Sequence, residues 1–114
     1  MESKRVPASF YKTEAGNEPV RDWLKSLGAD ERRAIGNNIR TLEYGWPIGM
    51  PICKPLRRGL FEVRTNLQDR IARVIFCIHE NNILLLHGFI KKTEKISDSD
   101  LSLALDRKQK LEQK

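Results

Sequence analysis

The chain has 114 residues, which is enough for one domain with its own core but leaves no room for a second. Its 21 Lys and Arg outnumber its 15 Asp and Glu, and the net charge of +6 favours a polyanionic partner such as nucleic acid about as much as an ordinary basic surface. The first residues lack the apolar stretch of a signal peptide and no segment approaches a membrane span, so we expect a cytoplasmic protein that does not bind membranes.

The first half of the chain predicts one strand and two helices. Residues 6–13, "VPASFYKT", favour a strand that Pro7 confines to an edge. Residues 18–44 predict a helical hairpin, because apolar residues recur at helical spacing in both of its halves. The stripes are Val20, Trp23, Leu24 and Leu27, then Ile35, Ile39 and Leu42. The expected caps are Asn17 and Asp30, and the expected ends are Gly28 and then Gly45 with Pro47.

The second half predicts strands followed by a helix. From Pro51 onward the segments "LFEVRT", "RIARVIFCIH" and "ILLLHGFIK" are rich in β-branched and apolar residues and are joined by short polar links, which is typical of an antiparallel meander. Ser97 can cap a last helix with the apolar stripe Leu101, Ala104, Leu105 and Leu111. Residues 1–114 therefore predict a single α/β domain of the α+β type.

Cysteine and histidine give no sign of a metal or cofactor site. Cys53 and Cys77 are not spaced as a pair, which favours reduced thiols. His79 and His87 have no cysteine or histidine at ligand spacing, so we expect both to be core or rim residues and no metal or other cofactor to be bound.

The link "NLQD" between the first two strands of the meander predicts their register. If residues 66–69 form the turn, Thr65 lies opposite Arg70 and Glu62 lies opposite Arg73. Alternation along the strands then places Glu62, Arg64 and Arg73 on one face of the sheet.

The second link leaves two registers open. A three-residue link, 80–82, places Arg73 opposite Phe89 with Lys91 on its face, whereas a two-residue turn at Asn81 and Asn82 places Arg73 opposite Ile90 with Lys92 on its face. In either register one lysine joins the arginines.

This grouping of cations indicates an anion site. Lysines at a strand end often only deter edge pairing, and Glu62 with Arg73 is compatible with a simple cross-strand ion pair. A lysine on the same face as Arg64 and Arg73, however, forms a like-charge cluster that is unfavourable without an anion. The predicted RNA-binding residues around it are Lys54, Arg57, Arg58 and Lys95, although Arg57 and Arg58 fit a solvated loop equally well.

Such a cluster suits RNA cleavage through the 2′-hydroxyl of the substrate, which requires alignment, proton transfer and stabilisation of charge on the phosphorane but no metal. Arginine and lysine supply the charge stabilisation. The general base is open: it is Glu62, a lysine with a lowered pKa, or a group of the target.

The order of elements and two motifs resemble the RelE/ParE superfamily of toxins from bacterial toxin–antitoxin pairs, in particular its phage-derived HigB-like branch. "GLFEVR" is similar to that branch's Gly-Leu-aromatic-Glu-x-Arg, and "LLHGFIKKT" to its Leu-His-Gly-Phe-x-Lys-Lys-Thr. The resemblance implies a RelE-like fold and an mRNA endoribonuclease that acts on the ribosome. It also implies a co-encoded antitoxin, expected to be a helix-turn-helix protein.

By matching position, the resemblance makes Arg64, Arg73, Lys91 and Lys92 the catalytic cations, with Glu62 beside them, and Lys54 a further basic site residue. Phe76 stands where relatives often have tyrosine, which leaves the base in doubt. Two alternatives remain: an inhibitor of DNA gyrase, as the ParE side of the superfamily suggests, and an RNA-binding module without catalysis.

Overall fold

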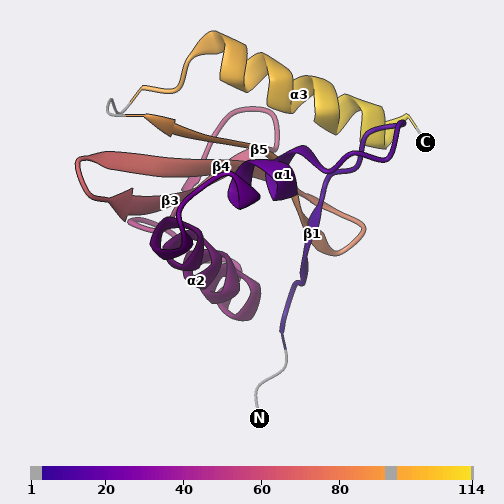
Figure 1. The fold of residues 1–114 in the computed structure, drawn as a ribbon. Coiled ribbons are helices and arrows are strands. Elements are labelled where there is room, and N and C mark those ends of the chain that lie inside the picture. Colours follow the sequence, from indigo (N-terminus) through magenta and orange to yellow (C-terminus); the bar gives the residue numbers. More distant parts are fainter. Residues whose placement is uncertain (1–3, 92–94, 114) are drawn as a thin grey trace.

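The computed structural model describes residues 4–91 and 95–113, and in this part of the chain it has five strands and three helices. Their order is β1 (Ala8–Phe10), α1 (Pro19–Lys25), α2 (Ala29–Gly45), β2 (Cys53–Pro55), β3 (Phe61–Leu67), β4 (Arg70–His79), β5 (Asn82–Lys91) and α3 (Asp98–Glu112). The strands form one sheet in the order β1-β5-β4-β3-β2, with α1 and α2 on one face and α3 on the other (Figure 1). The predicted α+β meander with three helices is confirmed.

Helices α1 and α2 cover one face of the sheet because their predicted apolar stripes face it. Val20, Ile35, Ile39 and Leu42 are buried against strand residues that include Val74. The two helices follow each other in sequence, but α1 packs mainly on β5 and α2 on β3. The predicted caps of these two helices, Asn17 and Asp30, were wrong. Helix α1 begins after Glu18, and α2 begins after Gly28, whose backbone N–H donates to Glu31 Oε1 at 3.3 Å.

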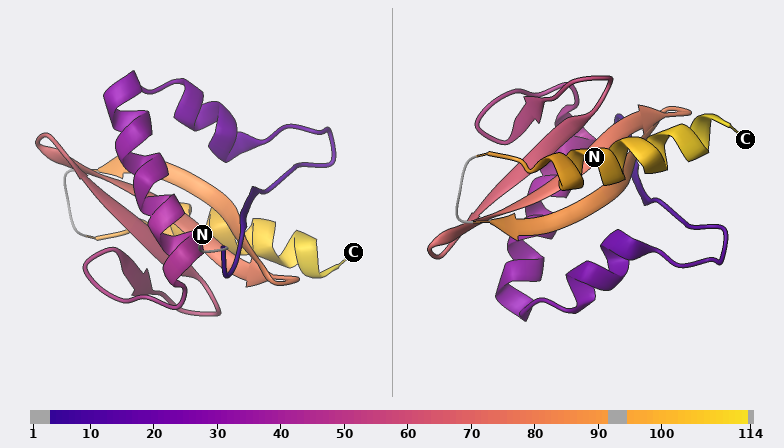
Figure 2. Two further views of the ribbon diagram at one scale, coloured as in Figure 1. Left: turned by 90° about the horizontal axis from the view of Figure 1, so that it is seen from below. Right: turned by 90° about the horizontal axis from the view of Figure 1, so that it is seen from above.

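Helix α3 crosses the opposite face of the sheet from α2, as the two views of Figure 2 show. Ser97 caps it as predicted, since its side-chain oxygen accepts the backbone N–H of Asp100 at 3.2 Å. Its stripe closes a second core over Ile75 and Leu86, with Ala104 fully buried and Leu101 partly so. None of the helices in the described part of the chain is long and apolar enough to cross a membrane.

Strand β1 is shorter than predicted and pairs in parallel with β5. A buried carboxylate holds the segment that leads into it: Glu43 of α2 accepts the Ala8 N–H at 2.7 Å and contacts Lys4 Nζ at 3.2 Å. The backbone oxygen of Glu43 accepts the N–H groups of Arg5 and Val6. The N-terminal segment is thus fixed by one residue of a helix rather than by a long ladder.

The predicted register of β3 and β4 was wrong by two residues, although the predicted face was right. The turn has only two residues, Gln68 and Asp69, so that Arg64 lies opposite Arg73 and Glu62 lies opposite Ile75. Asp69 makes this tight turn with a φ of +63°. A shift by two preserves alternation, so Glu62, Arg64 and Arg73 still share one face.

Neither predicted link between β4 and β5 was right. The turn consists of Glu80 and Asn81, both at positive φ, as a type I′ hairpin turn requires. A bulge at Leu86 then shifts the pairing, because Ile75 opposes His87 while Phe76 opposes Leu85. Beyond the bulge Arg73 opposes Phe89, so Lys91 shares its face, as the first of the two predicted registers required.

Candidate functional site

The centre of the site is a buried carboxylate between two guanidiniums. The side chain of Glu62 is fully buried, and its Oε2 lies 3.3 Å from Arg73 Nη1 while its Oε1 lies 3.4 Å from Arg64 Nε. Arg73 is 1% exposed and Arg64 is 14% exposed. A charged group this deep is stable only when paired, so Glu62 fixes both arginines, and of the three Arg64 is the one with a surface open to solvent.

Neighbouring elements hold this centre in place. Strand β2 pairs Lys54 with Glu62, which places Lys54 on the same face of the sheet. From the other face, the side-chain amide of Asn38 on α2 donates to the backbone oxygen of Arg64 at 3.1 Å and to Thr65 Oγ1 at 3.0 Å. We call Lys54, Arg64, Arg73 and Lys91 the cationic face: four strands contribute one residue each, on the side of the sheet that carries α3.

The first turn of α3 reaches the edge of the cationic face through Asp100. Its Oδ2 lies 2.8 Å from Lys91 Nζ, and its Oδ1 lies 2.7 Å from His87 Nε2. The His87 ring also stacks on Phe89, with ring centroids 5.3 Å apart. The imidazole is thus oriented by a carboxylate on one side and an aromatic ring on the other, which is the arrangement of a positioned acid–base group.

The contacts of Asp100 keep it ionised. Burial by itself raises the pKa of this carboxyl, but hydrogen bonds from Lys91, Ser97 and His87 outweigh burial and lower the pKa to about 2. Asp100 therefore carries a full negative charge at neutral pH beside Lys91, which is 29% exposed.

A basic groove opens beside the cationic face, between the loop after β2 and the chain that enters α3. Its cations are Lys54, Arg57 and Lys95, and its volume is about 290 Å³. The loop turns into β3 at Arg58 and Gly59, with φ values of +61° and +77°. Three of the four predicted RNA-binding residues therefore line one groove; Arg58, also exposed, forms the turn beside it.

The remaining predicted site residues fall into distinct places. Arg64, Arg73, Glu62 and Lys91 share one face, as expected, while Lys92 lies outside the described residues. Phe76, where relatives often have tyrosine, is buried on the face of α1 and α2 and stacks with Phe61 at 5.5 Å between centroids. A tyrosine at this position would therefore not reach the cationic face.

His87 and Asp100 are residues of the candidate site that the sequence analysis did not assign to it; His87 was expected only as a core or rim residue. The signal for His87 was available, because in the register that pairs Arg73 with Phe89 it lies two residues before Phe89 on the same face. Asp100 was predicted only as a residue of the first helical turn, since its contacts with β5 depend on how α3 crosses the sheet.

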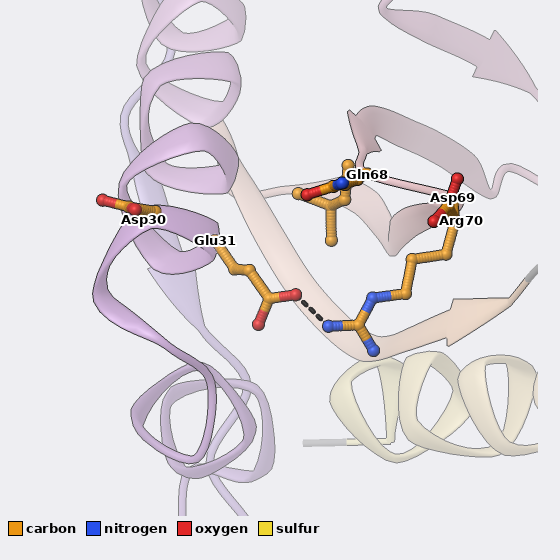
Figure 3. Close-up of a pocket in the computed structure, with 6 residues that line it drawn as sticks. Asp30, Glu31, Gln68, Asp69 and Arg70 are labelled. Atoms are coloured by element: carbon orange, nitrogen blue, oxygen red, sulfur yellow. Dashed lines mark hydrogen bonds and ion pairs between the residues drawn. The ribbon is translucent and has the colours of Figure 1, made fainter.

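A second hollow, of about 550 Å³, lies at the β3–β4 turn and the start of α2. Its charged lining is mainly acidic, with Asp30, Glu31 and Asp69 against Arg70. Figure 3 shows Glu31 and Arg70 pointing toward each other and joined by an ion pair, whereas Asp30 points away. Such a lining repels phosphate, so this hollow is a poor candidate for an anion site. In the described part of the chain, no group of three or more His, Cys, Asp or Glu comes together in a way that could hold a metal ion.

Fold and site together define a small α+β protein that presents a cationic sheet face beside its C-terminal helix. Residues 22–109 match the family described as phage-derived protein Gp49-like (DUF891), and the chain belongs to this family, which is associated with RelE-like toxins. No curated protein matches the sequence significantly. The matched residues run from α1 through most of α3 and include every residue of the cationic face.

Proposed function

We propose that the chain is a toxin of the RelE/ParE superfamily, of its HigB-like branch, and that it cleaves messenger RNA on the ribosome. The observation that carries the proposal is the cationic face, where Arg64 and Lys91 are partly exposed on strands whose positions are fixed from both sides of the sheet. Membership of a family associated with RelE-like toxins supports the same function.

The proposed reaction uses the RNA's own nucleophile. The 2′-hydroxyl attacks the adjacent phosphorus, the bond to the 5′-oxygen of the next nucleotide breaks, and the products are a 2′,3′-cyclic phosphate and a free 5′-hydroxyl. One proton leaves the 2′-oxygen and one is given to the 5′-oxygen, so the reaction is balanced without metal or water. Arg64 and Lys91 contact the phosphate and stabilise the charge that develops on it.

The buried residues act through the exposed ones. Glu62 and Arg73 have almost no surface that RNA can touch, so in this proposal they are positioning residues that hold Arg64 at a fixed angle. Among the described residues, His87 is the imidazole on this face, and Asp100 orients it, so His87 is the proposed proton-transfer group. Lys91 and Lys92 remain candidates to assist at the leaving oxygen.

The first experiment is brief induction of the wild-type chain and of Arg64→Ala in growing bacteria, with the 5′ ends of messenger RNA mapped within minutes. We expect new ends inside translated frames for the wild type and their loss in the folded variant. Arg33→Ala on the outside of α2, which removes the same charge from a side chain that is 72% exposed, is the matched control and should cleave normally.

Two further readouts separate the proposal from its alternatives. Purified ribosomes with a message that carries a 2′-deoxynucleotide at the mapped site should not support a cut there, since the nucleophile is missing. Growth arrest with intact messages and a DNA damage response would overturn the nuclease and favour gyrase inhibition. Bound but intact RNA would leave only an RNA-binding module.

A co-encoded antitoxin follows from this proposal. Its expected role is to cover the cationic face, and a helix-turn-helix protein encoded by a neighbouring reading frame is the first candidate. Co-expression of that protein should restore growth, and the two chains should copurify as a complex.

A further inference from the structure

The basic groove has a property that the reaction itself does not require. Lys54, Arg57 and Lys95 converge on it, and among the described residues none of the three has a carboxylate within ion-pair distance. Other cations of the described chain are ion-paired, including Lys91 with Asp100 and Arg70 with Glu31. Three cations against the single carboxylate of Asp98 leave the described lining with an excess of positive charge, which favours binding of an anion.

The lining of the groove also includes apolar side chains. Leu56, Ile96 and Leu101 lie at the rim of the second core, so their buried sides pack on the protein and their outer sides line the groove. A ligand that suits this mixed lining carries both an anionic group and a flat, largely apolar one, as a nucleotide does. The volume of about 290 Å³ is at the small end for ligand pockets, which begin at roughly 300 Å³, and so admits one nucleotide rather than a large cofactor.

Among the described residues, one carboxylate also lines the groove, that of Asp98 in the first turn of α3. An ionised carboxylate only accepts hydrogen bonds. Guanine is the base that offers two adjacent donors, N1–H and N2–H, on its Watson–Crick edge, and it can therefore bind a carboxylate through two bonds. Uracil offers one donor between two carbonyl oxygens, while adenine and cytosine place an acceptor beside their amino group, so each brings an oxygen or nitrogen lone pair against Asp98.

We infer that the groove binds a nucleotide next to the scissile phosphate and that Asp98 makes it select guanine. The location follows from Lys54, which lines the groove and also lies opposite Glu62 on the cationic face. The inference rests on the proposed function for the position of the cut, but the binding of guanine does not require cleavage.

The first test measures RNA binding without cleavage. It uses short single-stranded RNAs in which every 2′-hydroxyl is replaced, so that the RNA cannot be cut. The RNAs are compared in sets of three, which differ only in having guanosine, inosine or adenosine at one position. Their affinity for the protein is measured by fluorescence anisotropy. We expect guanosine to bind roughly tenfold more tightly than inosine, which lacks the 2-amino group, because a good bidentate contact discriminates by about this factor or more.

Asp98→Asn should remove the preference for guanosine while leaving affinity for the adenosine RNA within about twofold. The matched control is Asp106→Asn, the same change on α3 at a carboxylate that is 60% exposed and forms an ion pair with Lys110. Circular dichroism checks that both variants fold. Equal binding of guanosine and inosine by the wild type, or an unchanged preference in Asp98→Asn, would overturn the inference.

Mapped cleavage ends then separate the inference from the proposed function. If guanine is enriched at one fixed position beside the cuts, and Asp98→Asn abolishes this enrichment, both the guanine subsite and the nuclease are supported. Cuts with no base preference overturn the guanine subsite and leave the nuclease standing. A guanosine preference in the anisotropy assay that depends on Asp98, with no cleavage in cells, supports the subsite and overturns the nuclease.

Discussion

At the scale of single residues, two carboxylates organise the cations in different ways. Glu62 is fully buried and holds Arg64 and Arg73, so its charge is part of the folded scaffold. Asp100 is near the surface and bridges Lys91 and His87 across the junction of β5 and α3. The first arrangement sets the angle of a guanidinium, while the second joins a helix to a strand. Because Asp100 titrates within a pH range in which unfolding can be measured, the contribution of its bridge between α3 and β5 can be tested by changing the pH.

We predict that Asp100→Asn destabilises the protein at neutral pH but not in acid. The folded-state pKa of Asp100 is about 2, below its ordinary value of 3.8, so its stabilisation is fully present above about pH 5 and disappears as pH falls toward 2. The shift corresponds to about 2 kcal/mol of unfolding free energy. Urea unfolding at pH 7, 4 and 2.5 should show the difference between wild type and variant shrinking with pH. A difference that stays constant would mean that Asp100 acts by packing and not by charge.

At the scale of elements, the contact between α1 and β5 depends on a residue without a side chain. Gly88 lies under the ring of Trp23, and a Cβ built there would be 2.4 Å from Trp23 Cε3. This explains the glycine of "LLHGFIKKT" by packing and not by reactivity. Since His87 and Phe89 flank it, any shift of β5 at this point also moves the imidazole beside Asp100.

We predict that Gly88→Ala lowers the free energy of unfolding by about 1–3 kcal/mol, because overpacking forces the strand or the indole ring to move. Gly36→Ala is the matched control. Gly36 lies within α2 with no atom within 4 Å of an added Cβ, so alanine there should stabilise the helix by roughly 0.5–1 kcal/mol. Combining Gly88→Ala with Trp23→Leu should recover part of the loss. If the double variant lost as much unfolding free energy to the alanine as Gly88→Ala alone, the contact with Trp23 would not be the cause of the strain.

The elements also show where sequence patterns suffice and where they fail. Alternation along the strands predicted that Glu62, Arg64 and Arg73 share a face. This was correct although the predicted register was wrong by two residues, because a shift by two leaves each side chain on the same face. The turns were missed because Asp69 and Glu80 adopt positive φ, which the sequence does not signal for glutamate. The bulge at Leu86 and the parallel pairing of β1 depend on packing between distant segments, and so do the basic groove and the role of Asp100.

At the scale of the whole molecule, the position of charge matters more than its sum. The net charge of +6 includes arginines on α1 and α2 that alternate with acids, such as Arg33 with Asp30, as well as the cations of the groove on the α3 side. A diffuse basic surface would bind RNA through all of them alike. A localised site would bind RNA through Lys54, Arg57 and Lys95 and be nearly indifferent to the helices on the other face.

Salt dependence distinguishes these cases, since each phosphate contact with single-stranded RNA contributes roughly −0.7 to the slope of log affinity against log salt. We predict that the triple change Lys54→Gln, Arg57→Gln and Lys95→Gln reduces the magnitude of that slope by about 2 for an uncleavable RNA. The triple change Arg21→Gln, Arg32→Gln and Arg33→Gln removes the same charge from α1 and α2 and should leave the slope within about 0.5 of the wild type. Equal reductions in both variants would mean that RNA is held by the overall field and not by the groove. The contrast is informative because both variants have the same net charge, so any difference between them must come from where the charge lies.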